Sequence, residues 1–121
     1  MTHNQTVGSL GESLALDALR RRGYEIIEQN WHCRYGEIDI VARDDGSMVF
    51  VEVKTRISLK FGTPEEAVTT HKQARMIRCA EAYVAQHALK EIAMRMDIVA
   101  VELTPGRELV RLDIYPNAIQ G

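Results

Sequence analysis

The sequence lacks the long apolar runs, the cysteine pairs and the low-complexity tracts that define several large classes of protein. No stretch approaches the roughly 18 consecutive apolar residues of a membrane span, and residues 1–8 have neither the cationic nor the apolar region of a signal peptide. The two cysteines, Cys33 and Cys79, fit neither a paired metal spacing nor a disulfide framework. We therefore expect a cytoplasmic protein without a membrane partner, in which both cysteines are ordinary thiols.

Repeats and linkers are absent as well. The three prolines and eight glycines are scattered singly, so no segment reads as a boundary between domains. A chain of 121 residues, 45% of them hydrophobic, lies within the roughly 100–150 residues of a typical domain and can bury a core without a covalent staple. The sequence predicts a single domain over residues 1–121.

The net charge of -2 conceals an uneven distribution of charge along the chain. Residues 1–53 carry 5 basic and 9 acidic side chains, whereas residues 54–95 carry 8 basic and 4 acidic ones. A basic half beside an acidic half is suited to hold a phosphate backbone while carboxylates gather a cation. Mixed charge on solvated faces is the commoner explanation of such a pattern.

Apolar spacing predicts a first helix over residues 9–22. Ser9 and Glu12 form the S-x-x-E pattern of a capping box, and Gly23 is a stop signal directly after the helix. A second helix is predicted to begin at the capping pattern of Thr63 or at that of Thr70, and to end near residues 87–89.

Runs rich in β-branched and aromatic residues predict five strands, at residues 24–30, 37–43, 48–55, 94–103 and 108–115. The Asp45-Gly46 dipeptide between the second and third strands is a strong hairpin signal. The resulting order, α-β-β-β-α-β-β, indicates an α/β or α+β domain with a mixed sheet between helices.

Two neighbouring strands carry charged residues where buried apolar ones are expected. Glu37 and Asp39 share one face of the second strand because side chains alternate, and Glu52 and Lys54 share one face of the third. A symmetric loop centred on Asp45-Gly46 places Asp39 opposite Glu52. Continued along the strands, the same register places Glu37 opposite Lys54.

Opposed carboxylates destabilise a hairpin unless something neutralises them, because directly paired side chains have Cβ atoms about 5 Å apart. A divalent cation would neutralise Asp39 and Glu52, and hard carboxylate oxygens with room left for water suit Mg²⁺ or Mn²⁺ rather than zinc. The alternative is a cross-strand ion pair between Glu37 and Lys54, with Asp39 and Glu52 facing solvent on an open sheet face.

Asp39 with Glu52-Val53-Lys54 resembles the PD-(D/E)XK motif of restriction-endonuclease-like nucleases, whose core order is similar to the predicted one. Over residues 8–103 the wider pattern resembles the YraN-like family of small bacterial proteins, which is grouped by fold with Holliday-junction-resolvase-like nucleases. The leading proline of the motif is replaced by Ile38. The matching segments are Gly11-Glu12, Gly23-Tyr24, Asn30, Gly36-Glu37-Ile38-Asp39, Phe50 to Arg56, Phe61-Gly62, Lys72 and Arg95-x-Asp97.

The resemblance implies an α/β fold with a restriction-endonuclease-like core and a nuclease site. By position, Asp39 and Glu52 resemble the metal ligands, and the carbonyl of Val53 resembles the usual backbone ligand. Lys54 resembles the residue that orients or activates the attacking water.

Two further acids have alternative roles. Glu12 resembles the helix-one acid of resolvase-like members, which would make it a metal ligand, but a cap for the helix explains it equally well. Glu37 is either an outer acid that tunes Lys54 or its salt-bridge partner, and the second reading is favoured slightly. Asp97 either supports the site or pairs with Arg95.

The leading hypothesis is a Mg²⁺- or Mn²⁺-dependent nuclease that acts on DNA, including structured or branched DNA. The alternatives are a nucleic-acid-binding module without cleavage activity and a structural domain with ion-paired carboxylates. The low overall charge counts against tight DNA binding by a monomer, and a homodimer would assemble a larger basic surface. The candidates for phosphate contact are Arg56, Lys60, Lys72 and Arg75.

Overall fold

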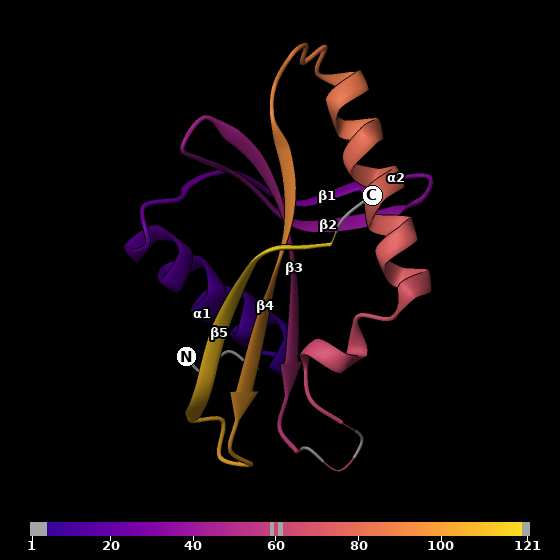
Figure 1. Cartoon of the computed structure of the whole chain (residues 1–121). Helices are drawn as coiled ribbons and strands as arrows, with labels where there is room; N and C mark the ends of the chain where they lie inside the picture. Colours follow the sequence, from indigo (N-terminus) through magenta and orange to yellow (C-terminus); the bar gives the residue numbers. More distant parts are fainter. Residues whose placement is uncertain (1–4, 59, 61, 120–121) are drawn as a thin grey trace.

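The computed structural model describes residues 5–58, 60 and 62–119, and in it a five-stranded sheet lies between two helices (Figure 1). Helix α1 spans Val7–Arg21 and α2 spans Thr70–Gln86, with the short 3-10 turn η2 at Glu65–Ala67 before it. The strands are β1 Glu25–Cys33, β2 Gly36–Asp44, β3 Ser47–Arg56, β4 Met94–Leu103 and β5 Leu109–Ile119. The predicted element order is confirmed.

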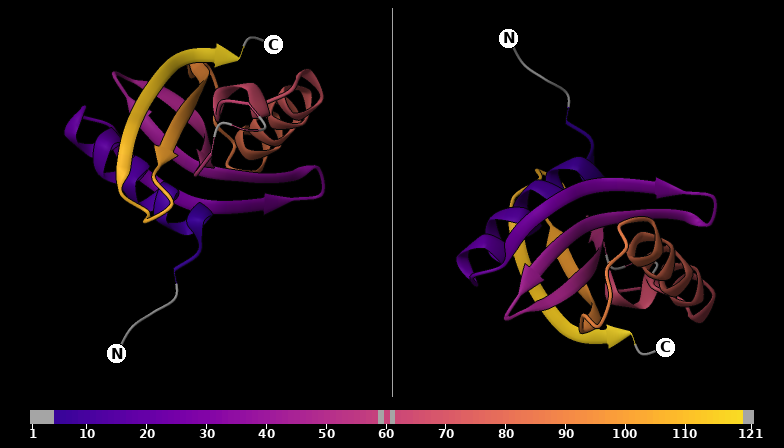
Figure 2. Two further views of the ribbon diagram at one scale, coloured as in Figure 1. Left: turned by 90° about the horizontal axis from the view of Figure 1, so that it is seen from below. Right: turned by 90° about the horizontal axis from the view of Figure 1, so that it is seen from above.

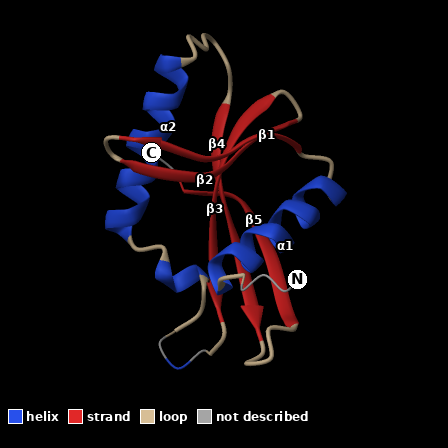
Figure 3. Ribbon diagram, turned by 180° about the vertical axis from the view of Figure 1, so that it is seen from behind, coloured by secondary structure: helices blue, strands red, loops and turns tan. Residues whose placement is uncertain are grey.

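The strands follow one another across the sheet in the order β1-β2-β3-β4-β5. Figure 3 shows these strands in red between the two helices in blue. Strands β3 and β4 are parallel, and the other neighbours are antiparallel. The parallel pair arises because α2 carries the chain back along the sheet between β3 and β4, as a crossover connection does. The predicted mixed sheet is therefore confirmed. Within the described residues, neither helix is long and apolar enough to cross a membrane.

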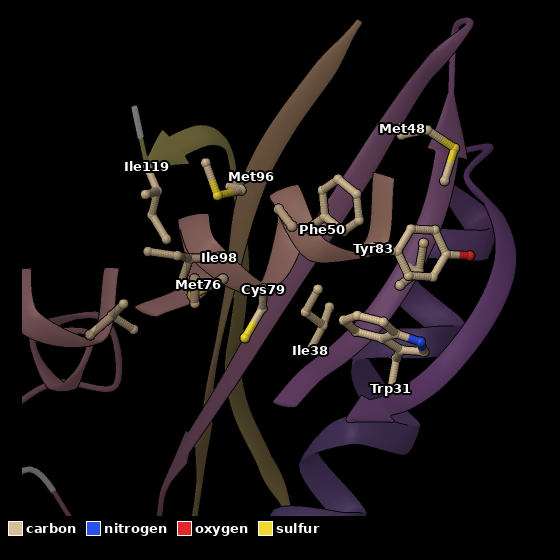
Figure 4. Close-up of a cluster of buried hydrophobic side chains, with 13 residues drawn as sticks. Trp31, Ile38, Met48, Phe50, Met76, Cys79, Tyr83, Met96, Ile98 and Ile119 are labelled. Carbon is tan, nitrogen blue, oxygen red and sulfur yellow. The ribbon is translucent and has the colours of Figure 1, made fainter. Parts of the chain in front are cut away.

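The helices cover opposite faces of the sheet (Figure 2). On the α2 face, the ring of Tyr83 lies edge-on to Trp31 and to Phe50, with centroids 5.1 and 5.6 Å apart (Figure 4). On the α1 face, Leu19 and Val51 are fully buried. Alternating apolar side chains of β3 thus supply two separate cores, which explains why this central strand is almost continuously hydrophobic.

The first helix begins earlier than predicted. The side chain of Thr6 accepts a hydrogen bond from the backbone N–H of Ser9 at 3.0 Å, so Thr6 is the N-cap. Ser9 lies inside the helix, and the predicted capping box of Ser9 with Glu12 is wrong. The predicted stop is confirmed, because Gly23 has a φ of 94° and the N–H of Tyr24 bonds to the carbonyl of Leu19 at 3.0 Å.

Of the two predicted capping patterns before the second helix, that of Thr63 is confirmed, and that of Thr70 is wrong by one residue. Thr63 and Glu66 form a reciprocal capping box: the N–H of Glu66 donates to Thr63 Oγ1 at 3.3 Å, and the N–H of Thr63 donates to Glu66 Oε1 at 3.0 Å. This box closes η2 rather than a long helix. Helix α2 begins at Thr70, and its N-cap is Thr69, whose side chain accepts from the N–H of Lys72 at 3.3 Å.

The hairpin between β2 and β3 has the predicted register. Asp45 and Gly46 have φ values of 49° and 80°, as a type I′ turn requires. The pairing runs from Asp44 with Ser47 to Ile40 with Val51. The next residues along the two strands are the two acids of the motif, Asp39 and Glu52.

Candidate metal and nuclease site

The β2–β3 ladder ends where the acids begin. Beyond the pair of Ile40 with Val51, the N–H of Val53 donates to Oδ2 of Asp39 at 2.8 Å. Glu52 lies close enough for its charge to act on the Asp39 carboxyl. The structure therefore brings together the two acids that the hairpin register predicted to be neighbours. At this point the backbone N–H of Val53 bonds to a side chain of β2, the Asp39 carboxyl, instead of to a backbone carbonyl of that strand.

The Asp39 carboxyl is costly to ionise in this position. Burial, followed by the charge of Glu52, raises its pKa to about 7, although the hydrogen bond from Val53 acts in the opposite direction. Glu37 adds a smaller repulsion. Near neutral pH, without a cation, the Asp39 carboxyl is thus partly protonated, and a divalent ion would replace that proton.

Lys54 projects beside the acids. Its Nζ lies 3.4 Å from Oε1 of Glu52, and the two side chains are 30% and 15% exposed. The predicted ion pair of Lys54 with Glu37 is wrong, because the β2–β3 pairing ends before it reaches them and Glu52 is the nearer acid on the same strand face. Glu37 instead lies 3.9 Å from the ring of His32.

Glu12 and Glu37 meet at the edge of the acid pair, through a residue to which the sequence assigned no role. With its amide oriented to satisfy both neighbours, the Asn30 side-chain nitrogen donates to Oε1 of Glu37 at 2.7 Å and to Oε1 of Glu12 at 3.2 Å. Burial, then Asp39 and Glu37, raises the pKa of Glu12. Helix α1 therefore directs Glu12 toward the site, and the signal for Asn30 was its place in the family pattern.

Asp39, Glu52 and the Val53 carbonyl form an all-oxygen donor set, which fits Mg²⁺ or Mn²⁺. Across residues 5–58, 60 and 62–119, no three His, Cys, Asp or Glu side chains gather closely enough to hold a metal ion. Glu12 therefore does not complete a three-carboxylate cluster here. Two carboxylates are sufficient for Mg²⁺, which commonly keeps several waters and takes further ligands from substrate phosphates.

The predicted phosphate-contacting residues lie on three segments: Arg56 ends β3, Lys60 lies in the loop that follows, and Lys72 and Arg75 lie in the first turns of α2. Phe61 of the family pattern lies outside the described residues. Arg75 packs against the start of β2, since a Cβ added to Gly36 would be 3.2 Å from its Cδ. Within the described chain, the Nε of Arg56 is a buried donor without a hydrogen-bond acceptor.

The structure settles the role of Asp97, which the sequence left open. Asp97 is fully buried and accepts hydrogen bonds from the Tyr24 hydroxyl at 2.7 Å, Arg95 Nε at 3.1 Å and the N–H of Asn117 at 2.7 Å. Arg95 also bonds to Asp44 at 2.7 Å, at the hairpin end of β2. This network ties β5 and the start of β1 to β4, so Asp97 supports the fold at the end of β2 opposite to Asp39.

The mixed sheet, the element order and the acid pair with its lysine define a small α/β protein with a restriction-endonuclease-like core. Residues 11–101 match the model of the uncharacterised protein family UPF0102, and the chain belongs to this family, which is the YraN-like one.

Similar proteins come from several organisms. A UPF0102 protein of Caldanaerobacter subterraneus subsp. tengcongensis is 46% identical over 105 residues, which cover 87% of this chain and 86% of that relative. A UPF0102 protein of Trichlorobacter lovleyi is 47% identical, with 95% and 91% covered. One from Nocardia farcinica is 48% identical, with 88% and 84% covered.

Proposed function

We propose that this protein is a divalent-metal-dependent nuclease that hydrolyses phosphodiester bonds in DNA, including structured or branched DNA. The observation that carries the proposal is the position of Asp39 against the Glu52-Val53-Lys54 segment: the N–H of Val53 donates to Asp39 Oδ2 at 2.8 Å, and Lys54 Nζ lies 3.4 Å from Glu52 Oε1. A purely structural ion pair needs one acid for each base. Here Lys54 is paired with Glu52, and burial together with the charge of Glu52 makes Asp39 unfavourable to ionise at neutral pH unless a cation is bound.

Asp39 and Glu52 would hold Mg²⁺ or Mn²⁺, with the Val53 carbonyl as a backbone ligand. When bound, such an ion polarises a phosphate oxygen, lowers the pKa of water and stabilises the leaving oxygen. Asp39 is already oriented for this role, because the N–H of Val53 fixes one of its oxygens. The acid that is preorganised by the fold loses little freedom when it binds a cation.

Lys54 would orient the attacking water and stabilise negative charge that develops on the phosphate. Its ammonium group has three donors, so it can bond to Glu52 and still direct a donor at water or phosphate. Phosphates on either side of the cleaved bond would be held by Arg56, Lys60, Lys72 and Arg75.

The test is cleavage of single-stranded, duplex, flapped and four-way DNA with Mg²⁺, Mn²⁺ or a chelator. We expect the parent protein to cut at least one substrate with metal and none with chelator. Lys54→Met should lower the single-turnover rate by roughly 10²-fold or more while DNA binding is retained. The matched control is Lys90→Met, because Lys90 is exposed and precedes β4, at the end of the sheet where β3 begins.

Each outcome has a defined meaning. A stable parent that binds DNA but cuts neither DNA nor RNA with any divalent ion supports the binding module instead. A Lys54→Met variant that cuts at the parent rate removes the lysine from the mechanism. Sedimentation velocity with and without DNA tests whether the acting form is a homodimer.

A further inference from the structure

A groove that the motif residues do not account for lies between the tip of the β1–β2 hairpin and the outer face of α2. It consists of two adjoining hollows of about 700 and 190 Å³, which share Tyr35 and Arg78 as lining residues. We call it the Tyr35 groove. Figure 2 shows the hairpin tip beside α2 in both of its views. We infer that the Tyr35 groove binds an unpaired polynucleotide strand and leads it to the acid pair, an inference that rests on the proposed nuclease function.

Positive charge dominates the walls of the groove. Arg34 comes from the hairpin tip, whereas Arg75 and Arg78 come from successive turns of α2, and all three side chains are exposed. The acid that lines the groove is Glu81. Guanidinium groups bind phosphate oxygens in a bidentate manner, so three of them along one channel favour a polyanion with repeated phosphates.

The groove also has an aromatic surface. The guanidinium carbon of Arg34 lies 4.8 Å from the centroid of the Tyr35 ring, and the Arg34 Nη2 donates to the Tyr35 hydroxyl. Both hollows open onto this ring. A positively charged channel with a stacking ring is the arrangement that proteins use for single strands, because every unpaired base presents a π-face. In a duplex, neighbouring base pairs cover those faces.

One wall of the groove lies beside the start of the strand that carries Asp39. The Arg75 side chain lies against Gly36, three residues before Asp39 in the chain. Cys33 lines the groove, and its sulfur is 3.5 Å from that of Cys79. Burial and Cys33 raise the pKa of Cys79 to about 12, Arg75 lowers it and Glu52 raises it, so the thiol beneath Cys33 lies within electrostatic range of both Arg75 and Glu52.

Binding is measured by fluorescence anisotropy in chelator, which separates it from cleavage. The probes are labelled single-stranded DNA, single-stranded RNA and duplex DNA of equal length. We expect both single strands to bind more tightly than the duplex, and their ratio distinguishes the sugar preference. Tyr35→Ala should weaken single-strand binding by about tenfold, whereas Tyr35→Phe should keep it, because the ring is retained.

The charge of the groove is tested with paired variants. Arg34→Gln with Arg78→Gln should weaken single-strand binding at least tenfold and reduce the salt slope by about one to two. The matched control is Arg20→Gln with Arg21→Gln, which removes the same charge from exposed positions on α1, across the sheet from α2. Equal weakening in both pairs, or displacement of the strand by polyglutamate as readily as by DNA, would overturn recognition by the groove.

Cys33 provides a second readout inside the groove. Cys33 is partly exposed, whereas Cys79 is fully buried, so a maleimide should label Cys33 first. A saturating single-stranded oligonucleotide should slow this labelling several-fold, as followed by mass spectrometry of the peptides. An unchanged labelling rate at saturation would place the strand elsewhere.

The two proposals fail in different ways. A parent protein whose single-strand binding depends on Tyr35 and Arg78, but which never cuts, refutes the nuclease and leaves the groove. A parent protein that cuts DNA, with groove variants that bind and cut as it does, refutes the groove and leaves the nuclease.

Discussion

Replacement of Asp39 by asparagine should stabilise the metal-free protein at neutral and alkaline pH. The substitution removes a carboxylate that burial and Glu52 make difficult to ionise, and it keeps an oxygen to accept the N–H of Val53. The pKa of Asp39 is about 7 in the folded protein against an ordinary 3.8. At 1.36 kcal/mol per unit this corresponds to about 4 kcal/mol as an upper value, and burial of an amide lowers the expected gain to about 2–4 kcal/mol.

The gain should depend on pH in a defined direction. Below about pH 4 the Asp39 carboxyl is protonated in both the folded and the unfolded chain, and the parent loses nothing to the variant through ionisation. As pH rises from about 4 to about 7, the unfolded chain ionises first, because the folded pKa is the higher one. The parent therefore loses stability relative to Asp39→Asn across this window, and the difference is constant at higher pH.

Urea unfolding in chelator at a series of pH values between 4 and 8 measures the difference. The matched control is Asp17→Asn, the same chemical change at an exposed position of α1, which should show little difference from the parent. Addition of Mn²⁺ at pH 8 should then stabilise the parent and not Asp39→Asn, since a ligand stabilises the state that binds it. Parallel stability curves for parent and variant between pH 4 and 7 would refute the reasoning.

Three further experiments test the fold around the site and the residues proposed to bind DNA. Asp97→Ala should lower the free energy of unfolding by about 3–5 kcal/mol in urea titrations, because Arg95 would lose a buried charge partner; a loss below about 1 kcal/mol would contradict this. Gly11→Ala should cost about 1–3 kcal/mol, because its Cβ would lie 1.8 Å from Thr55 Oγ1, and adding Thr55→Ala should restore most of the stability. The salt slope of DNA binding should fall by about three when the four basic residues after the motif are neutralised together, and an unchanged slope would exclude them. These are Arg56, Lys60, Lys72 and Arg75.

The features of the fold and site that the sequence predicted correctly are those encoded by short-range patterns. The period-two alternation and the Asp45-Gly46 turn gave the register of the hairpin, and with it the neighbourhood of Asp39 and Glu52. The strand at Met94–Leu103 was predicted with its observed bounds, because a continuous apolar run ends there at a proline-glycine turn. These features depend on residues within about ten positions of one another, where backbone preferences and side-chain alternation act directly.

Tertiary structure decided the contacts between distant segments. Lys54 pairs with Glu52 rather than Glu37 because the hairpin opens beyond Ile40 and Val51, a separation that no local pattern encodes. The approach of Glu12 to the acid pair depends on how α1 packs across β3.

The Tyr35 groove has the same origin. Its walls come from a hairpin tip and from a helix that begins 34 residues after the last residue of that tip, Gly36. The sequence pattern predicts which face of each element is apolar. It does not predict which charged side chains of the hairpin tip and of α2 lie near each other. The position of α2 relative to the hairpin tip is fixed by the packing of Tyr83 against Trp31 and Phe50, because closely packed rings hold the helix in one position on the sheet.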